Sequence, residues 1–292
     1  MANQALEVVA SSATTMTPPA SAAKAVHVAK LIDISKCIGC KACQVACMEW
    51  NGTRPEIGVN DGSYDNPPKL APQAWTVMKF DEVETKDGGL DWLIRKDGCM
   101  HCEDPGCLKA CPSPGAIVKM SNGIVDFKSE NCIGCGYCVQ GCPFDVPKIS
   151  PTTNKATKCT LCSDRVEVGQ DPACVKSCPT KALTFGPKDD QITLAESRIK
   201  DLNSRGYKNA MLYNPQGVGG THVMYVIPHG DRVNEYANLP VDPTISPTVE
   251  LWKGVMKPIA LIAMAAAVVT GVVHYVTKGP KVVEEEHDDI KG

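Results

Sequence analysis

The residues of this sequence best suited to chemistry are its sixteen cysteines, all of which fall between residues 37 and 178. They form four runs of four, and every run ends in C-x3-C. The first and third runs share the spacing C-x2-C-x2-C-x3-C, whereas the second gap widens to four residues in the second run and to eleven in the fourth. Repeated C-x-x-C spacing indicates metal ligation or redox chemistry, whereas disulfide frameworks are typical of small secreted domains. The runs are Cys37, Cys40, Cys43 and Cys47; Cys99, Cys102, Cys107 and Cys111; Cys132, Cys135, Cys138 and Cys142; and Cys159, Cys162, Cys174 and Cys178.

The spacing within the runs favours iron–sulfur clusters over zinc. Three closely spaced cysteines followed by a fourth exceed what one tetrahedral zinc ion needs. A [4Fe–4S] cluster takes four thiolates, and in two-cluster bacterial ferredoxins the fourth cysteine of each run binds the other cluster. Pro112, Pro143 and Pro179 follow three of the fourth cysteines, as in the ferredoxin run, while Met48 follows the first. We therefore predict four [4Fe–4S] clusters that use all sixteen cysteines; the alternative from a different class is a zinc-binding structural adaptor.

The pairing of the runs follows from what lies between them. A short predicted hairpin, 116–126, links the second and third runs as in a two-cluster ferredoxin. The first and last runs then form a second, permuted half, because 31–33 precedes Cys37 much as 124–126 precedes Cys132. Exchange of the fourth cysteine within each half predicts four ligand groups. They are group 1 (Cys37, Cys40, Cys43 and Cys178), group 2 (Cys47, Cys159, Cys162 and Cys174), group 3 (Cys99, Cys102, Cys107 and Cys142) and group 4 (Cys111, Cys132, Cys135 and Cys138).

Outside the cysteines the sequence offers no catalytic constellation. It contains no phosphate-binding glycine loop and no nucleophile beside a base. His101 is expected to be a hydrogen-bond donor near a cluster or a loop residue, because cysteines already fill every ligand position. The formal net charge is −3 and no basic stripe is present, which argues against nucleic acid as a partner. We therefore expect an electron-transfer chain without a catalytic site of its own.

The helices and strands expected around the cysteines predict an α+β fold. It consists of two pseudo-symmetric bacterial-ferredoxin-like halves with insertions, plus one C-terminal transmembrane helix. The insertion is expected to begin as loop and to form strands over 75–80 and 90–94. After the cysteines, a helix near 190–205 with Asp190 as N-cap and a strand over 221–227 are predicted. The predicted segments are a flexible arm (1–29), a four-cluster domain (30–185, with its insertion at 48–98), a cysteine-free extension (186–253), a transmembrane helix (254–277) and a charged tail (278–292).

The predicted transmembrane segment is long and apolar around its whole circumference. Residues 255–276 would span roughly 33 Å as a helix, enough for the hydrocarbon core of a bilayer. Trp252 and Tyr275 lie where interfacial aromatic side chains are common. The alternative, a buried helix of a soluble protein, fits poorly with an unbroken apolar surface and a charged tail. His274 is expected to be a hydrogen-bonding residue near the interface, and the flanking lysines do not set an orientation.

From about residue 28 to 278 the chain resembles the iron–sulfur β subunits of respiratory, membrane-bound formate dehydrogenases of the nitrate-inducible type. The cysteine runs alone indicate only the wider superfamily of four-cluster subunits. The cysteine-free stretch and the C-terminal anchor narrow the resemblance to this family. The matching stretches are 37–47, 92–111, 131–138, 158–162 and 213–225.

The resemblance implies partners and a location. In that family a catalytic α subunit oxidises formate at a molybdenum or tungsten pterin centre, and the β subunit passes electrons to a membrane cytochrome b γ subunit and so to quinone. It implies a single-pass protein of the bacterial inner membrane, in contact with lipid, with the cluster domain on the periplasmic side and the C-terminus in the cytoplasm. The α subunit of the family carries the export signal. A β subunit of another molybdopterin oxidoreductase or of a membrane hydrogenase is the alternative, and association of the heterotrimer into a higher oligomer is left open.

Overall fold

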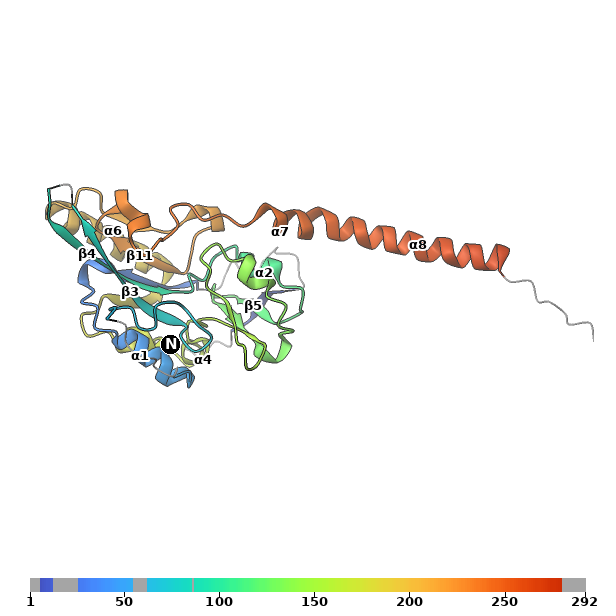
Figure 1. Cartoon of the computed structure of the whole chain (residues 1–292), viewed down its shortest axis with the longest axis horizontal. Helices are drawn as coiled ribbons and strands as arrows, with labels where there is room; N and C mark the ends of the chain where they lie inside the picture. The colour runs from blue at the N-terminus through green and yellow to red at the C-terminus, as the bar shows by residue number, and fades with distance from the viewer. Residues whose placement is uncertain (1–5, 13–25, 55–61, 86, 280–292) are drawn as a thin grey trace, which may run out of the picture. The chain divides into compact units, whose positions relative to one another are not determined.

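Two small β-sheets organise the part of the chain that carries the cysteines (Figure 1). The computed structural model describes residues 6–12, 26–54, 62–85 and 87–279. It separates into two units, Met1–Val249 and Glu250–Gly292, and all sixteen cysteines belong to the first. Each unit is described below by itself.

The larger sheet joins strands from both ends of the first unit. Its order is β10 (Met211–Tyr213), β11 (Val223–Ile227), β2 (Val28–Asp33) and β9 (Leu183–Pro187). β11 runs parallel to β2, and the other neighbours are antiparallel. The predicted cysteine-free extension therefore supplies two strands to the sheet of the first half rather than forming a separate body.

The smaller sheet belongs to the second half. β5 (Ile117–Met120) and β6 (Val125–Phe127) form the expected hairpin, and β1 (Val8–Ser11) pairs antiparallel with β5. The prediction of a flexible arm over 1–29 is therefore wrong for Val8–Ser11, because the open edge of β5 offers backbone hydrogen bonds to this short segment. Residues 1–5 and 13–25 of the predicted arm lie outside the described residues.

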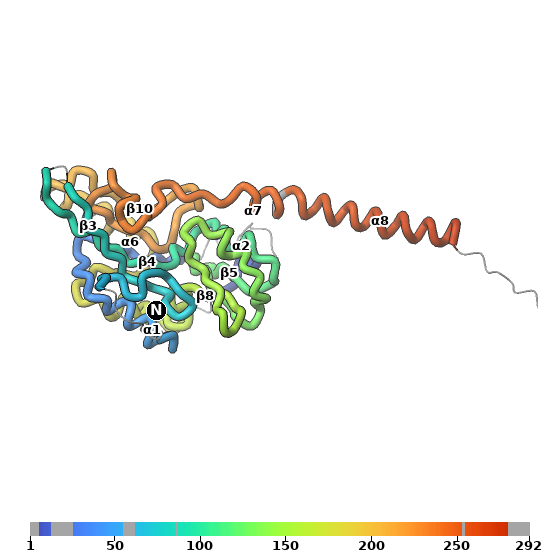
Figure 2. The backbone as a smooth tube through the Cα atoms, in the orientation of Figure 1, coloured from blue at the N-terminus to red at the C-terminus, as the bar shows by residue number. Residues whose placement is uncertain are grey.

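Short helices carry many of the cysteines. α1 (Ala42–Asn51) and α5 (Ala173–Lys176) pack together in the first half, and α2 (Gly106–Ala110) and α3 (Tyr137–Gln140) pack together in the second. In Figures 1 and 2 the blue segment of α1 lies apart from the green segments of α2 and β5. The remaining helices of the first unit include α4 (Ser163–Glu167), the 3-10 turns Ile34–Lys36, Ser129–Asn131, Gln216–Val218 and Gly230–Glu235, and α6 (Lys188–Ser204).

The insertion and the extension mostly follow their predictions. β3 (Thr76–Glu84) and β4 (Leu90–Gly98) form a long antiparallel hairpin, with a small hairpin of β7 (Lys148–Ile149) and β8 (Ala156–Thr157) in the second half. Residues 48–51, expected to be loop, continue α1 instead. Helix α6 begins at Lys188 after Pro187, so the predicted N-cap Asp190 lies inside its first turn. Asp189 and Asp190 still favour this end of the helix, because a carboxylate is stabilised by the helix dipole there.

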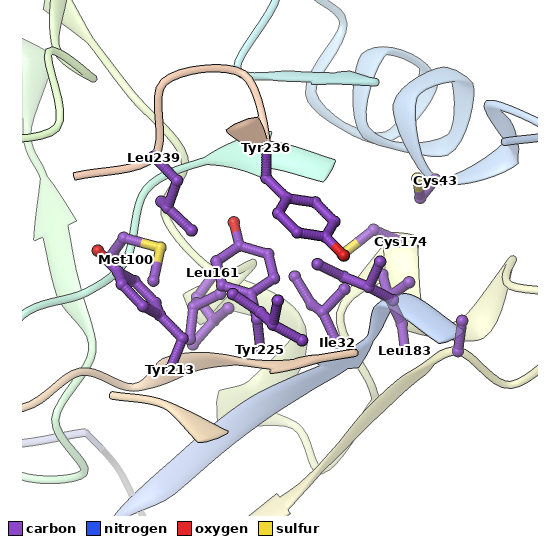
Figure 3. Close-up of a cluster of buried hydrophobic side chains, with 14 of the residues drawn as sticks. Ile32, Cys43, Met100, Leu161, Cys174, Leu183, Tyr213, Tyr225, Tyr236 and Leu239 are labelled. Atoms are coloured by element: carbon purple, nitrogen blue, oxygen red, sulfur yellow. The ribbon is translucent and has the colours of Figure 1, made fainter. Parts of the chain in front are cut away.

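The main hydrophobic core lies between the large sheet, the β3–β4 hairpin and the cysteine loops. Buried tyrosines Tyr213, Tyr225 and Tyr236 fill it, and Figure 3 shows Cys43 and Cys174 at one edge of the same cluster. A second core, between α6 and the large sheet, contains Leu31 and Leu202. Four of the cysteines, Cys43, Cys102, Cys174 and Cys178, thus belong to the main packed aliphatic and aromatic core.

The second unit contains the predicted membrane-spanning segment. α8 (Lys257–Lys278) has 22 residues, and the mean hydropathy of its 18-residue apolar window is 2.2, so it is long and apolar enough to cross a membrane. A short α7 (Pro247–Leu251) and a π-helical turn (Trp252–Met256) lead into it. The helix therefore begins three residues after the predicted boundary at 254. The predicted charged tail lies outside the described residues from 280 onward.

Candidate iron–sulfur centre

The two halves repeat one local plan for presenting cysteines. Each half has a strand, β2 or β6, that is followed by a three-residue 3-10 turn and then by the first cysteine of a run, Cys37 or Cys132. In both runs a residue with positive φ, Lys41 or Gly136, precedes the helix that carries later cysteines. The chain therefore turns sharply between the second and third cysteines, as a loop that wraps one side of a cluster requires.

In the first half the thiols of groups 1 and 2 lie next to one another. Burial raises the pKa of Cys37, and the neighbouring Cys178 and Cys40 raise it further. Burial also raises the pKa of Cys162 to about 12, with added contributions from its neighbours Cys159, Cys174 and Cys47. Cys47, Cys159, Cys162 and Cys174 line one pocket together.

In the second half the thiols of groups 3 and 4 lie together in the same way. Burial raises the pKa of Cys102, and Cys142, Cys99 and Cys107 raise it further. Burial raises the pKa of Cys138 to about 12, and its neighbours Cys111, Cys132 and Cys135 raise it further. The close approach of α2 and α3 requires glycine, because an added Cβ at Gly106 would lie 2.2 Å from the carbonyl oxygen of Gly141.

Thiols of different groups also lie close to one another, so that the four groups form a row. Cys174 of group 2 adds to the raised pKa of Cys43 in group 1, after burial as the main cause. Cys159 of group 2 acts in the same way on Cys99 of group 3, and Cys138 of group 4 on Cys107 of group 3. The spatial order of the groups is therefore 1, 2, 3 and 4, and the step between groups 2 and 3 crosses from one half to the other.

Solvent reaches this row at its two ends. Cys40 in group 1 and Cys135 in group 4 are exposed, whereas the other cysteines are buried or half-buried. Ile38 beside Cys40 and Ile133 beside Cys135 are 61 % and 62 % exposed. Each terminal group thus has an apolar surface residue next to its exposed thiol.

The donor set fits [4Fe–4S] clusters. All sixteen cysteines are free of disulfides although they lie in close groups. Burial raises the pKa of Cys43 to about 12, so a lone thiol there would stay protonated, and a bound cation would supply the charge that favours the thiolate. Backbone N–H groups already point at sulfur: those of Gly134 and Leu161 donate to Cys132 Sγ and Cys159 Sγ at 3.4 Å. A cubane bound by such thiolates accepts and releases one electron, and hydrogen bonds to its sulfurs help to set its potential.

His101 is fully buried and its ring orientation is fixed. The backbone N–H of Val125 donates to His101 Nδ1 at 3.1 Å, which leaves the proton of the neutral ring on Nε2. Burial lowers the pKa of His101 well below its usual value, so the ring is neutral. Nε2 has no hydrogen-bond partner among the described residues. An orphaned donor between Cys99 and Cys102 agrees with the expected role of His101 as a hydrogen-bond donor near a cluster.

Sequence reasoning missed four buried lysines in the cysteine region, of which Lys119 pairs with Glu103. The other three form no ion pair with a carboxylate in the described part of the chain. Lys30, Lys96 and Lys158 are 1 %, 3 % and 3 % exposed. Lys30 could have been found, since strand alternation places it on the same face of β2 as the core residue Ile32. The other two carried no comparable signal.

A separate cluster of His27, Glu103 and His222 braces the extension against the cysteine region. His222 is buried, and its ring nitrogens lie 2.6 Å from the Val28 carbonyl oxygen and 2.7 Å from Glu103 Oε2. Three side chains of this kind can bind a metal ion, and their ligand atoms lie within 4.8 Å of one another. Here, however, Glu103 already pairs with Lys119 and lies 4.0 Å from Lys188 Nζ. We therefore interpret the cluster as a hydrogen-bonded ion-pair network.

Comparison with known proteins agrees with this geometry. Two family models described as 4Fe-4S dicluster domains match residues 36–116 and 90–188, and a model described as formate dehydrogenase N, transmembrane, matches 245–288. The formate dehydrogenase-O iron-sulfur subunit of Escherichia coli is 57% identical over 99% of this chain and 97% of its own length. The nitrate-inducible formate dehydrogenase iron-sulfur subunit of the same species is 56% identical over 99% of both chains. The formate dehydrogenase iron-sulfur subunit of Haemophilus influenzae is 57% identical over 98% of this chain and 92% of its own length.

These matches confirm the predicted family and the predicted fold of ferredoxin-like [4Fe–4S] domains with a C-terminal apolar helix. They also indicate that the chain is a membrane-anchored electron-transfer subunit. The ranges matched by the two dicluster models overlap over 90–116, so they leave the pairing of runs open. Full-length identity of this size is decisive for the family, and the chain belongs to the iron–sulfur subunits of formate dehydrogenase.

Proposed function

We propose that this chain carries four [4Fe–4S] clusters, one on each of the cysteine groups 1 to 4, and passes electrons along them in that order. The observation that carries the proposal is that each cysteine group has a thiol close to a thiol of the next group, from group 1 to group 2, from group 2 to group 3 and from group 3 to group 4. A continuous row of one-electron centres conducts electrons without any catalytic residue on the chain. The exchange of Cys47 and Cys178 between the first and last runs is part of this proposal.

The two exposed ends of the row are the proposed contact sites of the partner subunits. Group 1, with exposed Cys40 and Ile38, faces a formate-oxidising α subunit that holds the molybdenum or tungsten pterin centre. Group 4, with exposed Cys135 and Ile133, faces a cytochrome b γ subunit that reduces quinone. The path of the chain supports this direction: Ile245, shortly before the apolar helix, lies against Gly106 in the half that holds groups 3 and 4.

The same proposal sets the location of the chain. The cluster unit lies on the periplasmic side of the bacterial inner membrane, α8 crosses the bilayer once, and the C-terminus lies in the cytoplasm. The names of the full-length relatives and the matched transmembrane family support a respiratory role at the membrane. A fluorescent protein fused after residue 292 should fluoresce, and alkaline phosphatase at the same position should be inactive; the reverse pattern would contradict the orientation.

The function is tested by purifying the chain with its native partners and adding formate. Formate should reduce the clusters of this chain, seen by electron paramagnetic resonance, and a quinone should then reoxidise them. Clusters that stay oxidised with formate but are reduced by another substrate of the purified partner would favour a different molybdopterin oxidoreductase or a membrane hydrogenase. A colourless chain that contains zinc in place of iron would favour the structural adaptor.

A further inference from the structure

Three buried ammonium groups lie near the group 2 cysteines. Lys30 Nζ lies 4.0 Å from Cys174 Sγ, and Lys30 lines the same pocket as the four thiols of group 2. Lys96 Nζ donates to Thr76 Oγ1 at 3.0 Å, and Thr76 lines this pocket too. Lys158 Nζ donates to the carbonyl oxygens of Val125 and of Cys159, the latter at 2.9 Å.

These lysines lack the usual compensation for a buried charge. Burying an ammonium group is costly unless an opposite charge lies close to it. Arg95, next to Lys96 in β4, has such a partner, because it pairs with Asp97 at 2.9 Å. In the described part of the chain, no carboxylate forms an ion pair with Lys30, Lys96 or Lys158, and their nearest negative groups include cysteine sulfurs. The charge that Lys30 and Lys96 face is therefore that of the cysteine groups, whereas Lys158 faces cysteines of groups 2 and 3 together with the buried carboxylate of Asp126.

The lysines are shared unequally among the groups. Lys96 faces Cys47, Cys159 and Cys174 of group 2 and also Cys43 of group 1. Lys158 faces Cys99 and Cys107 of group 3, the carboxylate of Asp126 and Cys159 of group 2. In group 4, by contrast, the neighbours that act on Cys138 are cysteines. Group 2 thus receives positive charge from both lysines, and group 4 from neither.

We propose that Lys30, Lys96 and Lys158 are fixed positive charges that raise the reduction potential of the cluster on group 2. Lys96 acts also on group 1, Lys158 on group 3, and Lys30 on both of these neighbours. A cluster bound by four thiolates becomes more negative by one charge when it is reduced, and a nearby buried cation stabilises that state. Reduction adds one electron and needs no proton from the lysines. The inference rests on the four-cluster assignment of the proposed function.

The test is a redox titration, monitored by electron paramagnetic resonance, of the full-length chain purified with its partners. Lys96→Met and Lys158→Met remove the charge and keep a long side chain. Each should lower two of the four potentials of this chain, and one of these potentials should be lowered by both substitutions. We expect at least about a tenfold change in the reduction equilibrium, which is about 59 mV for one electron. One potential, that of group 4, should be moved by neither.

Matched variants separate charge from packing. Lys96→Arg and Lys158→Arg keep the charge and should keep the potentials near their wild-type values. Lys200→Met removes a charge from the exposed surface of α6 and should move no potential by a comparable amount. If Lys96→Met or Lys158→Met loses iron, the corresponding Gln variant is titrated in its place.

Several results would overturn the inference. One is that the potentials in Lys96→Met and Lys158→Met move no more than in Lys200→Met, and another is that all four potentials fall equally. A third is that the Met and Gln variants both lose iron, because the lysines would then stabilise the fold and not set potentials. A failure of the proposed function itself looks different. Wild-type material would then contain fewer than about sixteen irons or fewer than four redox steps before any lysine is changed.

Discussion

Gly123, in the turn between β5 and β6, lies against the buried ring of His222, and replacing it by alanine should strongly destabilise the protein. Its φ is +91°, and an added Cβ would lie 1.9 Å from His222 Cε1. The ring cannot move aside freely, because both of its nitrogens are hydrogen-bonded, to Val28 O and to Glu103 Oε2. Gly123→Ala should therefore strain the backbone and also break the contact between the extension and the cysteine region.

The size of the effect can be worked out from these two parts. A left-handed backbone costs a residue other than glycine about 1–2 kcal/mol. Leaving buried polar groups unpaired costs about 1–3 kcal/mol each. With both ring hydrogen bonds of His222 lost, the sum is about 3–8 kcal/mol. Since about 1 kcal/mol lowers the melting temperature by about 2–4 °C in a domain of this size, we expect a fall of roughly 6–32 °C.

The assay follows the loss of iron–sulfur absorption on heating at one fixed rate, because unfolding that releases a cofactor is not a simple equilibrium. Gly206→Ala is the matched control. Gly206 has a φ of +102° but no heavy atom within 4 Å of an added Cβ, so its substitution should cost only the backbone strain, about 1–2 kcal/mol. Equal losses in the two variants would refute the role assigned to His222.

Three further predictions concern the core, a half-buried carboxylate and the anchor. Leu202→Ala, in the core between α6 and the large sheet, should cost about 2–5 kcal/mol, and Leu194→Ala on the exposed side of the same helix should cost far less when both are heated as above. Burial raises the pKa of Asp81, and its Oδ2 has no hydrogen-bond partner among the described residues. Because the pKa of Asp81 is raised, its ionised carboxylate destabilises the fold at a pH above that pKa. Asp81→Asn should therefore raise the melting temperature at pH 7, and this gain should shrink as the pH falls toward the raised pKa. A gain in melting temperature that grows as the pH falls would contradict the prediction. Truncation after residue 249, in cells without the partner subunits, should move the chain from the membrane to the soluble fraction with its iron content unchanged, whereas a full-length chain found soluble in such cells would contradict the membrane span.

The sequence predicts much of this protein because cysteine spacing and hydrophobic pattern are local signals. The four runs, the β5–β6 hairpin, the β3–β4 hairpin and α8 all follow from residues close together in the chain. What the sequence does not reveal depends on contacts between distant segments. Val8–Ser11 becomes a strand only because β5 offers an open edge more than a hundred residues later, and nothing near Val8 signals it.

The candidate site likewise combines residues that local sequence patterns predict with residues that only contacts between distant segments reveal. The cysteines could be found from spacing, but Lys96 and Lys158 could not, because lysine is normally an exposed residue and only the folded thiol groups give these two a reason to be buried. The hydrogen bond between Glu103 and His222 likewise joins residues that are 119 positions apart in the sequence. Helix α6 was predicted from its apolar face, yet it begins at Lys188 with Pro187 as N-cap. The sequence misplaced the start because an acidic residue is favoured both at an N-cap and in the first turn, where Asp189 and Asp190 lie.

Diffraction at the iron absorption edge is the sharpest test of the four proposed ligand groups, because it locates each cluster and its ligands in one experiment. We expect four clusters, about sixteen irons in total, in the order of groups 1 to 4. We also expect Cys47 Sγ about 2.3 Å, the distance known for zinc–thiolate bonds, from an iron of the cluster that Cys159, Cys162 and Cys174 hold. If Cys47 instead binds the cluster of Cys37, or if fully loaded protein holds only about eight or twelve irons, the ligand assignment is wrong.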